Sequence, residues 1–409
     1  MSEHIELSSL INRAIRHWKK HGTISTVQKA HREYLRSQYR DSFSNQIMSR
    51  ESLLEKARST GNVWFGEPEG QFTIRDPPKE YEFDNLGGLT GQYNPDKRYL
   101  CELSNCHIIG PSAAGVWDEK YIILDTVSGN LKKFQQRFPD FFPVELCQDI
   151  TFGELDRQKT QSISGPVLPL VPYQNQYYYH WLLEQLPKLR VLEQYVAENG
   201  TKPRLLIPSN PPSFVTESLE LLGYSADQLI EWDSDIAAVG SLLVTNHRSY
   251  SPHREFYSPS QNDCEWVRDT FINQIDQPDG RSPSRRTYIS RQEAERGRTV
   301  LNFDELKKWL SNQSFSVDVF EKHHFKRQVK ITNSSEIIMG PTGAGMSNIL
   351  FADDPLVVEL TLKGWTRPFY FLSEILGHEF RPYICDANDS NDLYININEL
   401  ERQISNHGL

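Results

Sequence analysis

The sequence has little cysteine, no long apolar run and no excess of positive charge. Its five cysteines are an odd number, lie far apart and form no C-x-x-C pair, which argues against a disulfide framework and a structural zinc site. No apolar stretch reaches the roughly 20 residues that cross a bilayer. The first ten residues, MSEHIELSSL, lack the basic-then-apolar order of a signal peptide. These absences predict a cytoplasmic protein with reduced thiols.

The charge balance excludes a further class of protein. The 409 residues include 44 Lys and Arg against 54 Asp and Glu, a formal net charge of −10, so the surface as a whole does not suit nucleic acid. Hydrophobic residues make up 38% and charged residues 24% of the chain, which is ordinary for a folded globular protein. At about 150 residues per domain, this length predicts two to three domains.

The first 40 residues differ from the rest in charge and pattern. Apolar residues from Leu7 to Trp18 recur at helical spacing and predict a stripe on one helix face. Between Ile11 and Arg40 basic residues dominate, and Glu33 is the only acid. Two interpretations stay open: a helix packed on the fold with a solvated basic face, or a helix that attaches peripherally to the anionic inner face of a membrane.

The pattern along the chain predicts an α/β protein of two domains that face a crevice. Short strand-like runs and turns dominate from Val63 to Phe142, and strands alternate with helices from about residue 164, as in parallel sheets covered by helices. Residues 274–286 are rich in Pro, Gly, Asp and Ser and are typical of a linker. We expect an N-terminal helical segment (1–60), an α/β domain with a β-rich lead-in (61–275), a second α/β domain (284–385) and a C-terminal helix (386–409).

The strongest local signal is a glycine turn between a strand and a helix. In EIIMGPTGAGMSNILF (336–351), Gly343 and Gly345 allow the backbone to approach a ligand, and the N-terminus of the next helix suits a phosphate. Gly340 and Gly345 have the spacing of a P-loop, but Met346 stands where a P-loop has lysine, so an NTPase is not expected. A tight strand-to-helix connection without a ligand is the alternative.

A carboxylate and an arginine-rich loop surround this turn in the expected fold. Glu359 ends the next strand, where a carboxylate can accept the hydroxyls of a ribose. The loop 291–298 brings Arg291 and Arg298, whose guanidinium groups can hold phosphate. The alternatives are a surface ion pair for Glu359 and neutralisation of the arginines by the glutamates of their own loop.

A histidine and a glutamate stand four residues apart earlier in the chain. His180 and Glu184 share one helix face in YYYHWLLEQLP (177–187). Such a pair can deprotonate an acceptor hydroxyl, or it can be a hydrogen-bonded structural pair. The sequence has no H-E-x-x-H, and we interpret Asp233 and Asp235, which form a D-x-D, as a turn, so no metal is expected.

Together these segments resemble glycosyltransferase family 61, including its bacterial and archaeal polysaccharide-biosynthesis members. The resemblance covers roughly residues 160–385 and rests on three motifs in order. These are YHWLLEQLP (179–187), then SR (290–291) with R-x-x-x-N-x-x-E-L (298–306), then GPTGAGMSN-x-L-F (340–351) followed by VVEL (357–360). Many relatives have a histidine where this chain has Thr342, so that imidazole's role in holding donor phosphate does not carry over.

The resemblance implies a GT-B-like pair of Rossmann-type domains, with the acceptor on the first and the nucleotide sugar on the second. It implies inverting, metal-independent transfer from a nucleotide sugar, which we expect to be UDP-linked, to a hydroxyl of a glycan or lipid-linked glycan in surface polysaccharide biosynthesis. A sugar-nucleotide epimerase and a non-catalytic nucleotide-sugar-binding protein are the alternatives. The expected catalytic residues are Glu184 as the general base and His180 as its orienting partner, or the reverse. The expected donor-binding residues are Arg291, Arg298, Asn302, Thr342, Gly343, Ala344, Gly345, Asn348 and Glu359.

Overall fold

The computed structural model describes most of the chain from residue 46 onward. The described residues are Thr23, Val27, 46–60, 62–78, 81, 90–127, 161–171, 178–233, 236–247, 260–275, 285–294, 297–365 and 368–405. The predicted N-terminal helix, most of the predicted linker and Asp235 lie outside them.

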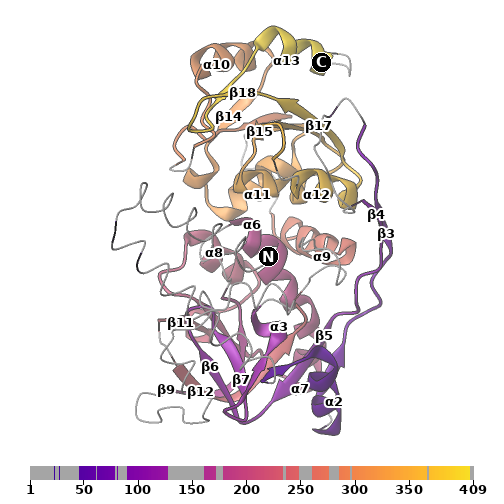
Figure 1. Ribbon diagram of the computed structural model, residues 1–409, viewed down its shortest axis with the longest axis vertical. Helices are drawn as coiled ribbons and strands as arrows, with labels where there is room; N and C mark the ends of the chain where they lie inside the picture. The colour runs from indigo at the N-terminus through magenta and orange to yellow at the C-terminus, as the bar shows by residue number, and fades with distance from the viewer. Residues whose placement is uncertain are drawn as a thin grey trace, which may run out of the picture. The chain divides into compact units, whose positions relative to one another are not determined.

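The described elements form a mixed α/β protein, as predicted (Figure 1). They divide into two compact units. Unit 1 consists of Met1–Asn62, Glu102–Val167 and Asp233–Val244, and unit 2 of Val63–Cys101, Leu168–Trp232 and Thr245–Leu409. The two units therefore interleave along the sequence, and unit 2 contains segments from both of the α/β domains expected above.

Unit 1 is built on a sheet whose strands run in the order β1-β8-β7-β6-β12-β9. The hairpins β6–β7 and β7–β8 are antiparallel, whereas β12 pairs with β9 in parallel. In the turn between β7 and β8, Asp118 and Glu119 both adopt positive φ, which suits the twist of a tight hairpin. The elements are β1 (Ile47–Met48), α2 (Arg50–Thr60), β6 (Cys106–Ile109), β7 (Ala114–Trp117), β8 (Tyr121–Ile123), α3 (Leu124–Val127), β9 (Gln161–Pro169) and β12 (Ile236–Thr245).

The first part of unit 2 joins short strands to a group of helices. The antiparallel pairs β2–β5 and β3–β4 lie in the region where short strands were expected, and β10 and β11 pair in parallel. The elements are β2 (Val63–Phe65), β3 (Phe72–Ile74), β4 (Gly91–Tyr93), β5 (Tyr99–Leu103), α6 (Tyr178–His180), the π-helix η2 (Trp181–Gln185), the 3₁₀-helix η3 (Leu186–Val191), α7 (Leu192–Asn199), β10 (Arg204–Pro208), α8 (Ser213–Leu221), η4 (Ala226–Gln228), β11 (Leu229–Trp232) and α9 (Gln261–Ile272).

The second part of unit 2 is a five-stranded parallel sheet in the order β14-β13-β15-β16-β17. Its central strands are nearly continuous buried runs, as expected when helices cover both faces. Figure 1 shows α10 and α13 on one side of this sheet and α11 and α12 on the other. The elements are β13 (Arg286–Ile289), α10 (Phe303–Asn312), β14 (Ser316–Asp318), η5 (Phe320–Lys322), α11 (Phe325–Asn333), β15 (Ile337–Pro341), η6 (Ala344–Phe351), β16 (Leu356–Thr361), α12 (Pro368–Leu376), β17 (Glu379–Ile384) and α13 (Ile397–Ser405).

The C-terminal segment differs from the helix predicted over 386–409. Residues 386–394 hold the hairpin β18 (Asp386–Ala387) and β19 (Leu393–Tyr394), and helix begins only at Ile397. The side-chain oxygen of Asn388 accepts the backbone N–H groups of Ser390 and Asp392, at 3.0 and 2.8 Å. An asparagine that bonds its own downstream backbone favours a turn over a helix, which explains the difference.

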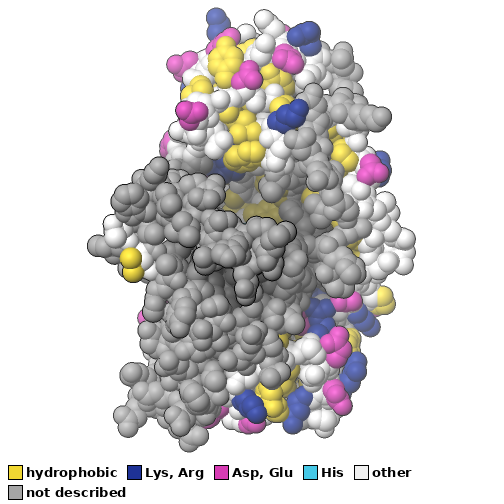
Figure 2. All heavy atoms as spheres, viewed as in Figure 1, with side chains coloured by type: hydrophobic (Ala, Val, Ile, Leu, Met, Phe, Trp, Pro, Cys, Tyr) yellow, Lys and Arg dark blue, Asp and Glu magenta, His cyan; other side chains and the backbone are white. Residues whose placement is uncertain are grey.

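The surface of the described part mixes both signs of charge. Figure 2 shows acidic and basic side chains interspersed on the face in view. Among the described residues, no helix is both long and apolar enough to cross a membrane.

Candidate functional site

The order of the parallel sheet points to one edge as the place for a ligand. In chain order its strands run 2-1-3-4-5, so the direction of winding reverses between β13 and β15. In open parallel sheets, ligands bind at the carboxyl ends of the strands beside such a switch point. The residues that follow these two strands are Ser290-Arg291 and Thr342-Gly343. The predicted arginine loop and glycine turn therefore meet at the switch point.

Arg291 and Gly343 are in direct contact there. A Cβ atom on Gly343 would lie 2.8 Å from Cζ and 2.9 Å from Cδ of Arg291, so the guanidinium lies over the glycine backbone. Gly343 has an extended φ of 177°, so space and not backbone strain requires glycine at this position.

The guanidinium of Arg291 is half-buried, and its Nε–H has no hydrogen-bond acceptor within the described part of the chain. Burial lowers the pKa of Arg291, and the charge of Glu321 opposes that shift. Arginine nevertheless remains protonated, so a partly desolvated cation with an unused Nε–H donor stands at the switch point. Such a group is stabilised by an anion that accepts charge-assisted hydrogen bonds.

Arg298 supports the glycine turn. Its Nη1 donates to the carbonyl oxygen of Thr342 at 2.8 Å, and its guanidinium lies 5.2 Å from the ring centroid of Trp365. The structure thus brings Arg298 to the predicted site, where it holds the backbone of the turn.

Thr342 and Glu359 form a buried pair behind the turn. The Thr342 hydroxyl donates to Oε1 of Glu359 at 2.7 Å, and Glu359 has no exposed surface. Glu359 lies on the neighbouring strand as predicted, but its contact here is with Thr342. The residue that departs from the family pattern therefore supplies a hydroxyl to this carboxylate.

Asn302 lies at the start of α10 and connects that helix to the segment before α13. Its Oδ1 accepts from the backbone N–H of Ile395 at 3.0 Å, and its Nδ2 donates to the Ile395 carbonyl at 2.8 Å and to Glu305 at 3.0 Å. All the polar atoms of this side chain are used inside the fold, which favours a structural role for it.

Asn348 joins the glycine turn to the helix that carries His180. Its Nδ2 donates to the carbonyl oxygen of Gly345 at 2.9 Å, and its Oδ1 accepts from the hydroxyl of Tyr178 at 2.8 Å. Both Asn348 and Tyr178 are buried. The predicted turn, where Ala344 begins η6, and the predicted His180 segment are thereby linked within unit 2.

The His180 segment is helical as predicted, but it is not a regular α-helix. It passes from α6 through the π-helix η2 to the 3₁₀-helix η3, with the Leu186 N–H bonded to the Trp181 carbonyl. Pro187 has no N–H to bond to the residue four positions earlier, and a proline in a helix forces the hydrogen-bond ladder to adjust. π-helical turns occur often at functional sites.

His180 and Glu184 form a close pair in this helix. Nδ1 of His180 lies 2.5 Å from Oε1 of Glu184, and the two side chains are 29% and 11% exposed. An imidazole held by a buried carboxylate through Nδ1 carries its proton there and leaves Nε2 as the basic atom.

A second histidine, which no motif in the sequence indicated, approaches the same carboxylate. Nε2 of His247 lies 4.0 Å from Oε2 of Glu184, and the His247 side chain is 11% exposed. The sequence places His247 two residues after the apolar run LLVT (242–245), at the end of an expected strand. Binding and catalytic residues often lie in the loops that follow strands, so this position could have indicated it.

A buried ion-pair network fixes the backbone before His247. Arg98 donates to both carboxylate oxygens of Asp263, at 3.2 and 2.9 Å, and to the carbonyl of Asn246 at 2.7 Å. Arg98 and Asp263 are 1% and 0% exposed, and Arg190 adds a second cation that binds Glu69. Removal of Arg98 or Asp263 would leave the other charge buried and unpaired, which is strongly destabilising. The ion pair therefore holds the backbone at Asn246 in place.

The described residues contain no group of three or more His, Cys, Asp or Glu side chains that could hold a metal ion. Asp233 is exposed, and its D-x-D partner Asp235 lies outside the described residues.

Residues 178–358 match the family model of Glycosyltransferase 61. The match includes the His180 helix, His247, Arg291 and the glycine turn, and it ends within β16. No curated protein matches the chain. The matched domain shows that the chain is a glycosyltransferase, an enzyme with a donor and an acceptor substrate.

Proposed function

We propose that this enzyme transfers a sugar from a UDP-linked donor to a hydroxyl of a glycan or lipid-linked glycan acceptor, with inversion at the anomeric carbon and in surface polysaccharide biosynthesis. In this proposal the sheet β13–β17 is the donor-binding domain of a GT-B-like enzyme. The observation that carries the proposal is the contact of Arg291 with Gly343 at the switch point of the sheet.

Arg291 is the residue we assign to the donor diphosphate. Its guanidinium is partly desolvated and its buried Nε–H lacks an acceptor among the described residues, so a diphosphate would satisfy both its charge and its donors. The backbone N–H groups at the start of η6, beyond Gly343, add donors of the kind that bind phosphate. Arg298 and the Thr342–Glu359 pair shape this turn from behind.

We assign the general base to Nε2 of His180 and the orienting carboxylate to Glu184. Glu184 is the more buried of the two, and its carboxylate accepts a hydrogen bond from Nδ1 of His180. This arrangement makes Nε2 the proton acceptor and stabilises the imidazolium that forms. His247 approaches the other oxygen of the same carboxylate, with its Nε2 at 4.0 Å from Oε2.

In the proposed transfer step, these groups account for the proton, the new bond and the leaving group. Nε2 of His180 removes the proton of the acceptor hydroxyl, and the oxygen attacks the anomeric carbon of the donor sugar. The bond from that carbon to the diphosphate oxygen breaks, and its electron pair leaves on UDP. Arg291 and the backbone N–H groups offset the charge that develops on the leaving group, so in this proposal no divalent metal is needed.

The match to the glycosyltransferase domain supports transfer over the epimerase and sensor alternatives. The test is a release assay for UDP from a panel of UDP-sugars, with and without oligosaccharide acceptors, in the presence and absence of a chelator. We expect release that depends on an acceptor, persists in chelator and gives a product of inverted anomeric configuration by NMR. Release that requires Mn²⁺ or Mg²⁺, or a product of retained configuration, would contradict the mechanism.

The location of the enzyme is a separate proposal, since the residues that suggest it lie outside the described part. We propose a cytoplasmic enzyme whose N-terminal stripe from Leu7 to Trp18 gives weak contact with the anionic inner membrane face. Flotation with anionic vesicles should recover the full chain and lose the chain without residues 1–22. Equal, negligible binding of both would assign the stripe to packing within the protein.

A further inference from the structure

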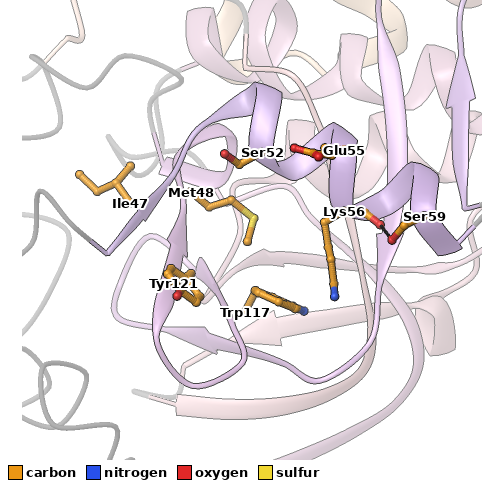
Figure 3. A pocket seen from close by; sticks show the side chains of 8 residues that line it. All are labelled: Ile47, Met48, Ser52, Glu55, Lys56, Ser59, Trp117 and Tyr121. Atoms are coloured by element: carbon orange, nitrogen blue, oxygen red, sulfur yellow. Dashed lines mark hydrogen bonds between the residues drawn. The ribbon is translucent and has the colours of Figure 1, made fainter.

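Unit 1 contains a pocket apart from the residues discussed so far. It lies between α2 and the β7–β8 hairpin, as Figure 3 shows, and has a volume of about 450 Å³. This volume is within the range of roughly 300–1,000 Å³ that small-ligand sites occupy. The lining residues are Ile47, Met48, Ser52, Glu55, Lys56, Ser59, Trp117 and Tyr121.

Two aromatic rings form one wall of the pocket. Trp117 and Tyr121 are direct partners across β7 and β8, and their rings stack with centroids 5.7 Å apart and planes inclined by 26°. Both side chains are half-buried and line open space. Such a wall offers apolar ring surface and two polar tips, the indole N–H and the phenol O–H. Lys120 lies over the Tyr121 ring, with its Nζ 5.3 Å from the ring centroid.

The opposite wall is one polar face of a helix. Ser52, Glu55, Lys56 and Ser59 follow the i, i+3, i+4, i+7 spacing of a single helix face, and all four are exposed. This face offers hydroxyl, carboxylate and ammonium groups, both donors and acceptors, with one negative and one positive charge. Balanced charge suits a neutral ligand rich in hydroxyls better than a phosphate.

The helix is held firmly in place by its other contacts. Leu53 and Ala57, on its buried side, are 1% and 0% exposed. Arg50 at its start binds Asp125 through two hydrogen bonds of 2.9 and 2.8 Å. The polar wall is thus presented by a fixed element, which lowers the entropy cost of binding.

We propose that this pocket binds a neutral pyranose unit of a glycan. The C–H groups on one face of a pyranose carry partial positive charge and pack on aromatic rings, here Trp117 and Tyr121. Its hydroxyl groups bond to Glu55, Lys56 and the serines of α2. Lys56, whose Nζ lies over the Trp117 ring at 4.8 Å from its centroid, can bond a hydroxyl of a sugar that packs beside it.

The test measures sugar binding directly and does not depend on transfer. Saturation-transfer NMR with maltose, cellobiose and lactose is applied to the whole protein, and dissociation constants are measured for the best probe. We expect Trp117→Ala to weaken binding at least about tenfold, because it removes the main apolar wall. Glu55→Ala should weaken binding as well, and it changes an exposed helix position that folding does not depend on.

The matched control is Trp266→Ala. Trp266 is also a half-buried tryptophan and lines a second pocket of about 430 Å³ in unit 2, among mainly apolar residues. Sugar binding that is intact in Trp266→Ala and reduced in both unit 1 variants supports the proposal. Absence of binding by the wild-type chain, or equal binding by wild type and Glu55→Ala, overturns it. UDP release in the same samples reports on the catalytic proposal separately.

Discussion

The guanidinium of Arg291 occupies the space that a side chain at position 343 would fill. A Cβ on Gly343 would come within 2.8 Å of Cζ of Arg291, far inside van der Waals contact. The glycine thus does more than permit a turn, since it makes room for a cation at the reversal point of the sheet. Two residues distant in sequence define the proposed phosphate site through this contact.

Adding one methyl group at this point should therefore displace the arginine. We expect Gly343→Ala to fold and to weaken UDP binding about tenfold or more, because Arg291 must leave its present position. Calorimetric titration with UDP measures the effect. Gly70→Ala is the control, since a Cβ at Gly70 meets only one ordinary contact. Equal UDP affinity in both variants would remove Arg291 from the phosphate site.

Removing the cation itself gives a second test. Arg291→Ala should weaken UDP binding by about 1.5–3 kcal/mol, roughly 10- to 150-fold in Kd, as for the loss of charge-assisted hydrogen bonds. Arg291→Lys should recover only part of the affinity, because lysine keeps the charge but loses the planar fork. Arg381→Ala, on the edge strand β17, should bind UDP like the wild type. An unchanged Kd in Arg291→Ala contradicts the assignment.

Substitution of Glu184, the carboxylate that orients the proposed base His180, tests the assignment of the base. Glu184→Gln should lower kcat about 10²-fold or more and leave UDP affinity intact, since an amide no longer fixes the His180 tautomer or stabilises its charged form. His180→Ala should be at least as damaging. His324→Ala is the control, because His324 also pairs with a glutamate, Glu217 at 2.7 Å, but is largely exposed. Full activity in Glu184→Gln would place the base elsewhere.

The hydrogen bond between Tyr178 and Asn348 makes a prediction about stability. Tyr178→Phe leaves the buried Oδ1 of Asn348 without its 2.8 Å donor and should lower the free energy of unfolding by about 1–3 kcal/mol. Urea unfolding of wild type and variant measures this. Tyr394→Phe, at a ring 48% exposed, should change stability little. Equal losses in the two variants would mean that the bond contributes nothing specific.

The buried His378 should make the protein less stable at acid pH. Burial lowers the pKa of His378, and its Nε2 donates to the Ile349 carbonyl at 3.0 Å. Its folded pKa lies below the unfolded value of about 6.5, so the unfolded state binds more protons as pH falls and stability is lost below that pH. His378→Gln keeps a donor but cannot titrate, so its free energy of unfolding should fall less than that of the wild type between pH 7 and pH 5.

His324 is the matched control, because its pKa is shifted in the opposite direction to that of His378. Glu217 raises the pKa of His324 through a hydrogen bond and its charge. The stability from that pair is present below the unfolded pKa and is lost as pH rises through the folded pKa. His324→Gln should therefore reduce the loss of stability on going to alkaline pH and leave the acid loss unchanged. A reversed order of the two variants would contradict both assignments.

The sequence by itself determined the local elements and the types of residue at the site. Alternation of apolar runs with helical spacing predicted that strands and helices alternate in the later part of the chain, because these periods reflect which side each residue buries. The glycine turn, the arginine loop and the spacing of His180 and Glu184 were also visible, since each depends on residues near one another in the chain. The turn over 388–392 was not predicted, although its asparagine and aspartates could have indicated it.

Only the tertiary structure decided which of these residues meet. The contact of Arg291 with Gly343 follows from β13 and β15 being neighbours, and strand order is not encoded in the period of either strand. His247 joins Glu184 because a buried ion pair fixes the backbone after β12, far along the chain from the helix it approaches. Packing of distant segments likewise assigned Asn302 and Glu359 to hydrogen bonds inside the fold. Local pattern specifies the chemistry that each segment can offer, whereas long-range packing determines which groups come close enough to act together.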